Sequence, residues 1–139
     1  MLKINHCLFL LSAAFFCSPV AGLDIAQAEE KNRVFEIRTY YANEGKLDAL
    51  LARFRDHTVT LFKKHGMTNV GYWVPVDNKE NKLVYMLAFP SREARNKAFK
   101  AFSADPDWQK ARKESTKDGR LVKKIVNDFL AGTDFSKIK

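Results

Sequence analysis

Residues 34–41 read VFEIRTYY, and the architecture of the chain follows from this segment. It is rich in β-branched and aromatic residues, and it alternates between two kinds of side chain, which predicts a β-strand. Successive side chains of a strand point to opposite faces of the sheet. We expect Phe35 and Ile37 to face a core covered by helices. The mixed aromatic and charged face carries Val34, Glu36, Arg38 and Tyr40.

A helix is predicted from Lys46 to His65, because apolar side chains recur there at spacings of three and four residues. Gly66 follows its last turn and is suited to the left-handed conformation that ends helices. Residues 68–76 (TNVGYWVPV) and 82–89 (KLVYMLAF) are predicted strands. The polar segment between them is short, so these two strands should pair antiparallel.

The last third of the chain contains two more helices and a strand. Ser91 is placed to cap a helix, and Asp105-Pro106 is typical of the start of a second one that ends near Gly119. Residues 121–130 (LVKKIVNDFL) are the final strand. The order strand, helix, strand, strand, helix, strand is the ferredoxin-like βαββαβ pattern, an α+β fold with one antiparallel sheet and helices on one face.

The mixed face of the first strand needs either water or a partner. Two such sheets facing each other would form a dimeric α/β barrel with a polar and aromatic cavity inside. We therefore expect a homodimer that binds a small organic molecule.

The N-terminus has the three parts of a secretory signal peptide: a short segment with Lys3, an apolar run over residues 7–17, and small residues ending in Ala26-Gln27-Ala28. We expect cleavage after Ala28, so that residues 1–28 are removed and the domain extends over residues 33–136. An uncleaved membrane anchor is the alternative, although the apolar run is too short to span a bilayer. The exported protein would be periplasmic or secreted, with no stable membrane span.

Both cysteines, Cys7 and Cys17, lie in this segment, so the mature chain would have no disulfide and no thiol ligand. The chain has 24 basic and 16 acidic residues, a formal net charge of +8. The basic residues are spread along the sequence without a run of five, which is typical of a solvated surface, and nucleic acid is not expected as a partner.

Seven short motifs occur in the order found in the NIPSNAP family, part of the wider group of dimeric α/β-barrel proteins. They lie between Val34 and Ser136: FEIRTY at 35–40, GKL at 45–47, FRDH at 54–57, HG at 65–66, GYW at 71–73, DPDW at 105–108 and GTDFS at 132–136. Tyr85 stands where the family often has a histidine. The chain thus resembles this family, and the resemblance implies the βαββαβ fold and dimerisation without implying a known reaction.

His57 is the candidate catalytic base, because a histidine at the edge of a buried stripe exchanges protons near neutral pH. The alternative interpretation is that His57 is half-buried and has only a structural role. Candidate ligand-binding residues are Arg38, Glu36, Tyr40, Trp73 and Tyr85. An arginine on a sheet that lines a cavity suits a carboxylate or enolate oxygen. Alternatively Arg38 and Glu36 pair with each other, and the aromatic residues only pack.

Metal and cofactor sites are not expected. His57 and His65 lack an i, i+4 partner and a nearby cysteine, and no phosphate-binding loop, dinucleotide-binding glycine pattern, HExxH or GxSxG motif is present. Two classes of function remain. One is a small-molecule-binding or enzymatic dimer, with His57 as base and Arg38 and Tyr40 stabilising an anion. The other is a non-catalytic interaction module of the bacterial envelope.

Overall fold

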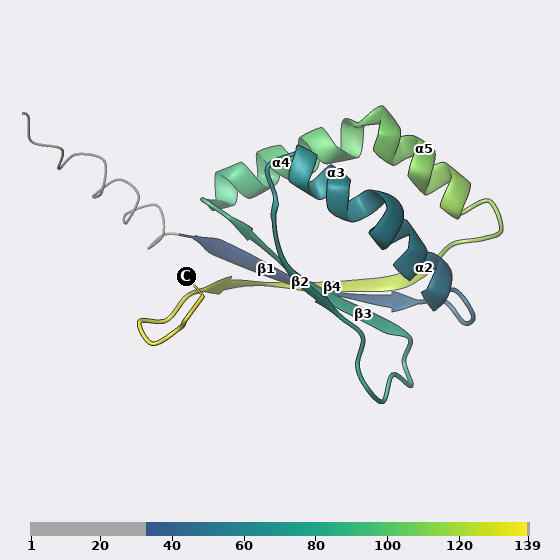
Figure 1. Ribbon diagram of the computed structural model, residues 1–139, viewed down its shortest axis with the longest axis horizontal. Helices are drawn as coiled ribbons and strands as arrows, with labels where there is room; N and C mark the ends of the chain where they lie inside the picture. The colour runs from purple at the N-terminus through teal and green to yellow at the C-terminus, as the bar shows by residue number, and fades with distance from the viewer. Residues whose placement is uncertain (1–32, 139) are drawn as a thin grey trace, which may run out of the picture.

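The computed structural model describes residues 33–138, and the predicted signal peptide lies outside the described residues. Within this part of the chain, four strands form one sheet and the helices all cover the same face of it (Figure 1). The elements are β1 (Val34–Ala42), α2 (Leu47–Arg53), η1 (Phe54–Thr58), α3 (Val59–Lys64), β2 (Thr68–Trp73), β3 (Lys82–Phe89), α4 (Arg92–Ala104), α5 (Pro106–Ser115) and β4 (Val122–Ala131).

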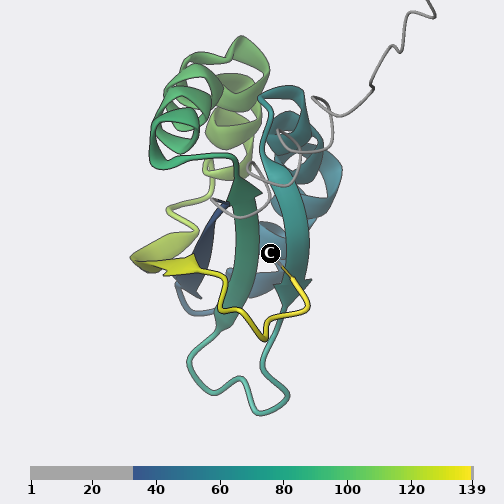
Figure 2. The ribbon, with the colours of Figure 1, turned by 90° about the vertical axis from the view of Figure 1, so that its left-hand side faces the viewer.

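The sheet has the strand order β2-β3-β1-β4, and every neighbouring pair is antiparallel. This order and the alternation of helices and strands confirm the predicted ferredoxin-like α+β fold. Figure 2, a quarter turn away, again has the helices on one side, while the β2–β3 loop and the C-terminal segment lie away from them. β1 is central, and its residues Arg38 and Tyr40 pair with Tyr85 and Leu83 of β3.

The predicted helix over residues 46–65 is one continuous helix with a π-helical turn, η1, between α2 and α3. The backbone N–H of Val59 donates to the carbonyl of Phe54, five residues earlier. The hydroxyl of Thr58 donates to the carbonyl of Arg53, five residues earlier, at 3.2 Å and so bridges the same turn. Arg53, Phe54 and Thr58 are all buried.

The second half of the helix layer is held by side-chain caps. Ser91 Oγ accepts from the backbone N–H of Ala94 at 3.1 Å, and Asp105 accepts from the N–H of Asp107 at 2.8 Å. Asp105 also binds His65 Nε2 at 2.6 Å and Lys64 Nζ at 2.8 Å. The hydrogen bonds from Lys64 and His65 hold the pKa of this carboxyl well below its usual range. The carboxylate therefore joins the end of α3 to the start of α5.

The hydrophobic core fills the space between the sheet and the helices. Its buried members include Leu50, Phe54, Phe62, Leu83, Tyr85, Leu87, Phe89 and Phe102. Aromatic rings meet edge to face throughout this layer: Phe54, for example, lies 5.7 Å from Tyr40 and 5.9 Å from Tyr72, measured between ring centroids. The core therefore positions aromatic groups from both the helices and the sheet around one interior region.

The face assignment predicted for β1 is wrong. Glu36, Arg38 and Tyr40 lie under the helices, because Glu36 binds Arg95 of α4 and Tyr40 packs against Phe54 of η1. Phe35 and Ile37 accordingly lie on the opposite face, which no helix covers. Alternation identifies the residues that share a face, but it does not identify the face that is covered. Here a buried carboxylate with two cationic partners replaces the apolar contact that was expected.

Candidate functional site

A buried ion network lies on the helix-facing side of β1. The carboxylate of Glu36 has no exposed surface. It accepts hydrogen bonds from Arg38 Nη1 at 2.5 Å and from Arg95, whose Nη2 and Nε lie 2.7 and 2.8 Å from the two carboxylate oxygens. Two guanidinium groups share one carboxylate, so the network carries an excess positive charge beneath the helices.

Arg38 connects this network to phenol groups. Its Nη2 donates to the Tyr40 hydroxyl at 3.4 Å, and its guanidinium lies 5.0 Å from the ring centroid of Phe99. Tyr85, the neighbour of Arg38 on β3, is completely buried. Neither the Tyr85 hydroxyl nor Arg38 Nε has a hydrogen-bond partner among the described residues. Burial, together with the nearby Tyr40, raises the pKa of Tyr85 well above its ordinary value, so the phenol stays protonated.

A hollow of about 230 Å³ lies next to this cluster, between the helix layer and the sheet. Tyr40 and Phe99 border both the hollow and Arg38. Its aromatic walls are Tyr40, Phe54, Phe62, Phe99, Phe102 and Trp108. Three arginines, Arg53, Arg112 and Arg120, also line it, and none of its described lining residues is acidic.

Arg53 is the most unusual of these arginines, because it is only 8% exposed and forms no ion pair with any described residue. Its Nη1 donates to Ser115 Oγ at 3.4 Å, its guanidinium lies 5.3 Å from the ring centroid of Trp108, and its Nε has no hydrogen-bond partner in the part of the chain described. Burial lowers the pKa of Arg53, and the charge of Arg112 lowers it further. A buried guanidinium with so few partners is costly for the fold.

The structure brings four of the predicted site residues together: Glu36, Arg38, Tyr40 and Tyr85. Trp73 is not among them. It lies 51% exposed on the face without helices, where its ring covers Gly71 so closely that a Cβ atom there would lie 2.4 Å from it. A role for Trp73 in the same cavity is therefore excluded by its position.

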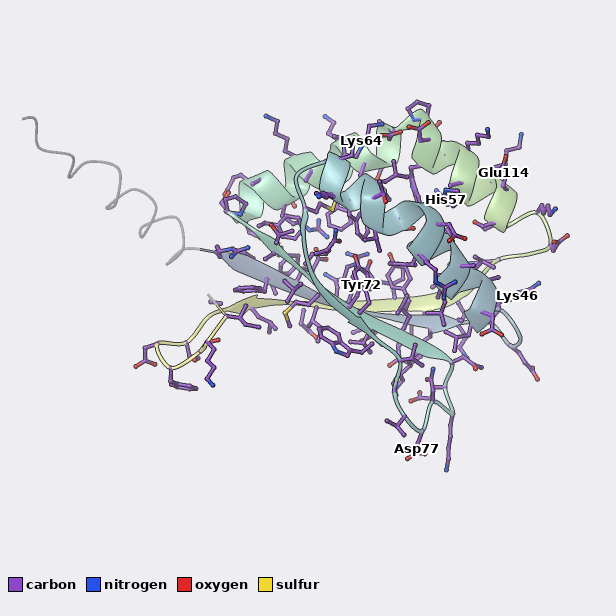
Figure 3. The ribbon with its side chains drawn as sticks, in the orientation of Figure 1. Lys46, His57, Lys64, Tyr72, Asp77 and Glu114 are labelled. Carbon is purple, nitrogen blue, oxygen red and sulfur yellow. The ribbon has the colours of Figure 1, made fainter. Side chains whose placement is uncertain are left out.

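His57 is also remote from the cluster. It is exposed on η1 and lines an open groove between the first helix and α5, where it shares the surface with Asp56 and Glu114. Figure 3 shows His57 on the helix layer and Tyr72 in the space between helices and sheet. The hypothesis that His57 acts together with Arg38 and Tyr40 in one cavity is wrong for this arrangement, since the helix itself separates them.

The arginines of the hollow are not among the site residues predicted from the sequence. For Arg53 a signal was present, because it follows Leu50 by three residues and immediately precedes Phe54, so that it falls within the apolar stripe of its helix. A charged residue inside such a stripe is rare and needs a partner. Arg112 and Arg120 lie at the end of α5 and in the loop after it, and their sequence context carries no comparable signal.

Within residues 33–138, no group of three or more His, Cys, Asp or Glu side chains is placed to hold a metal ion. None of the helices in this range has the length and apolar character needed to cross a membrane.

The fold and this buried site define an α+β, ferredoxin-like protein with an interior rich in arginine and aromatic residues. The sequence profile of the NIPSNAP family matches residues 35–137, and the chain belongs to that family. No curated protein matches it.

Several solved structures are similar. A NIPSNAP family protein of unknown function from Agrobacterium tumefaciens is 27% identical, with a TM-score of 0.69 over 78% of this chain and 96% of that one. An uncharacterised NIPSNAP-like domain protein from Burkholderia xenovorans is 18% identical, with a TM-score of 0.67 over 76% and 90% of the two chains. A Chloroflexus aurantiacus protein classed provisionally as an antibiotic biosynthesis monooxygenase shares the fold, at 18% identity, a TM-score of 0.50 and coverage of 78% and 100%.

We predict that Glu36→Gln lowers the free energy of unfolding by about 3 kcal/mol, because it leaves two largely buried guanidinium groups without a counter-charge. Urea unfolding at neutral pH measures the change. Glu44→Gln is the matched control, since Glu44 is exposed and its loss of charge should change stability by less than about 0.5 kcal/mol. Equal effects of the two substitutions would contradict the importance of the network.

Proposed function

We propose that the protein is an exported homodimer that binds a small organic molecule in the hollow between the sheet and the helices. The observation that carries this proposal is a hollow lined by six aromatic rings and three arginines, one of which, Arg53, has a buried Nε without a hydrogen-bond partner in the described residues. Buried donors without partners are rare in folded proteins, and a bound molecule is one way to satisfy them.

The size of the hollow limits the ligand. A volume of about 230 Å³ lies just below the range of drug-sized sites, roughly 300–1,000 Å³. It exceeds the roughly 150 Å³ of an apolar cavity that accommodates benzene. A compound with a single aromatic ring and a small polar substituent fits these limits. Its ring would pack against the aromatic walls, and its polar group would reach the arginines or the phenols of Tyr40 and Tyr85.

Any chemistry in this site would use guanidinium and phenol groups. Arg38 and Tyr40 adjoin the hollow, and Tyr85 holds its proton, so these groups are suited to stabilising an oxygen anion. His57 has no place in this proposal, because it lies outside the helix layer.

We predict that benzyl alcohol, a neutral compound of this size, binds the wild-type protein with a Kd on the order of 1 mM. The binding should shift amide signals of hollow-lining residues in a two-dimensional NMR titration. Ile125→Trp should abolish the shifts, because Ile125 lines the hollow and a larger side chain would fill it. Val76→Trp, on a fully exposed residue of the β2–β3 loop, should bind as the wild type does. Shifts absent from the wild type, or unchanged in Ile125→Trp, would refute the proposal.

The proposal of a homodimer rests on the face of the sheet that no helix covers. This open face is largely apolar. It includes the buried Phe35 together with Ile37, Thr39, Trp73, Val84, Met86, Val126 and Leu130, and its edge strand β4 adds one charged residue, Asp128. Trp73, Val126 and Leu130 are 51%, 37% and 41% exposed. Contiguous apolar surface of this kind is typical of protein interfaces. A second copy of the chain, which presents the same face, would bury it symmetrically.

We predict that the chain from Glu29 onward has the mass of a dimer by light scattering, and that Val126→Glu has the mass of a monomer. The substitution places a charge in the middle of the apolar surface, where burial would be costly. Val76→Glu adds the same charge away from the open face and should remain dimeric. A monomeric wild type at about 100 μM would rule out the interface.

Export is proposed from the signal-peptide pattern of residues 1–28. When the full chain is produced in a Gram-negative bacterium, we expect the protein in the periplasmic or extracellular fraction to begin at Glu29. Intact-mass measurement of that fraction tests this, and a protein that keeps residues 1–28 in the cytoplasmic fraction would refute it.

A non-catalytic interaction module of the envelope is the second candidate. It is favoured by large apolar side chains outside the open face, since Phe135 is 84% exposed and Val76 is completely exposed. The NMR titration separates the two, because an interaction module has no reason to bind benzyl alcohol in its interior.

A further inference from the structure

We infer that the ligand of the hollow is an aromatic carboxylic acid, with its ring among the aromatic walls and its carboxylate on the guanidinium of Arg53. This inference rests on the proposed function and specifies its ligand class. The geometry that carries it is a guanidinium that is more than nine-tenths buried, lines the hollow and lacks an ion-pair partner among the described residues.

The arginines in the interior fall into two groups. Arg38 and Arg95 both bind the carboxylate of Glu36 and are thereby neutralised in part. Arg53 forms no such ion pair, and the positive charge of Arg112 acts against its own. Arg112 and Arg120 border the same hollow. Three cations therefore surround a space whose described lining contains no carboxylate, and an anion would bind there with favourable electrostatic energy.

Arg53 borders two surface depressions that differ in charge, and this difference indicates from which of them an anion reaches the guanidinium. Arg53 also borders the open groove that contains His57. Besides Arg53 itself, that groove holds three acidic residues, Asp56, Glu114 and Asp118, and one lysine, Lys117, so acidic groups predominate. None of the three carboxylates forms an ion pair with Arg53. An anion is repelled on the groove side and attracted on the hollow side. The exposed Arg112 and Arg120 on the hollow side are suited to guiding it inward.

The position of Arg53 is set by the backbone. Arg53 falls within the apolar stripe of its helix and directly precedes the π-helical turn. Arg53, Phe54 and Thr58 all line the hollow, so a cation and an aromatic wall come from consecutive residues. Trp108 packs on the guanidinium at 5.3 Å and limits its movement. A planar guanidinium held in this way offers two parallel N–H donors to a carboxylate, with little loss of side-chain entropy on binding.

The experiment compares benzoate with benzyl alcohol, which has the same ring and no charge. By NMR titration or calorimetry of the wild-type protein at low ionic strength, benzoate should bind at least tenfold more tightly. Arg53→Met, which keeps an apolar stem of similar length, should reduce this ratio to about one while benzyl alcohol still binds. Arg55→Met is the matched control, because Arg55 is an exposed arginine two residues further along the same helix, and it should keep the ratio of the wild type.

The outcomes separate this inference from the proposed function. If benzyl alcohol binds but benzoate binds no more tightly, the anionic ligand is refuted while a small-molecule site stands; if neither binds, both are refuted. A ratio unchanged in Arg53→Met would refute the role of that residue. Should Arg53→Met fail to fold, Arg112→Gln on the exposed end of α5 replaces it, with an expected loss of at least threefold in benzoate affinity alone.

Inorganic phosphate is the third probe. It carries charge without a ring, so it should bind more weakly than benzoate if the aromatic walls contribute. Equal affinity for phosphate and benzoate would show a general anion site and would refute the aromatic part of the inference.

Discussion

The contact between Glu36 and the two arginines Arg38 and Arg95 determines how the layers of this protein are arranged. Glu36 lies on the central strand, and Arg95 lies on α4, so the ion network joins the sheet to the helix layer by charge-assisted hydrogen bonds to a carboxylate without exposed surface. A buried carboxylate is tolerated only where it is paired. The pairing in turn requires the even-numbered side chains of β1 to face the helices. Arg38 and Tyr40 lie on the same side of the strand as Glu36, so the polar part of the interior also lies on that side.

This constraint explains why the sequence predicted the fold better than the site. Apolar side chains that recur every two residues predict strands, and those that recur about every 3.6 residues predict helices; these patterns located the elements to within a few residues. The observed sheet order agrees with the predicted arrangement of those elements. The face of β1 could not be predicted, since an apolar side is normally the covered one. Glu36 and Arg38 are exceptions because of Arg95, a residue 59 positions away in the sequence. The pattern of a single strand contains no information about such a partner.

The π-helical turn is a second feature that periodicity did not predict. The stripe of apolar residues from Leu47 to Phe62 is compatible with a regular α-helix, and one wider turn alters only the direction of a few side chains. Those few include His57, which faces solvent, whereas Arg53 precedes the wider turn and faces the interior as part of the apolar stripe. The histidine had been the more attractive candidate on chemical grounds. Its position shows that the direction of a side chain around the helix axis decides whether it reaches an interior site. A single wider turn of the helix can change that direction.

The interior contains one cation cluster that is paired and one that is not, and the difference has a consequence for stability. Glu36 gives Arg38 and Arg95 a permanent partner, so that network stabilises the layers in every state of the protein. Arg53 and Arg112 have no carboxylate of their own among the described residues, and natural selection removes such costs unless the free charge is used. Replacing Arg53 by an apolar residue should therefore leave the unliganded fold as stable as before or more so. The open face is on the other side of the same strand, where Ile37 and Thr39 alternate with Arg38 and Tyr40. A partner that covers that face would restrict the movement of β1, and the groups that border the hollow would become more rigid with it.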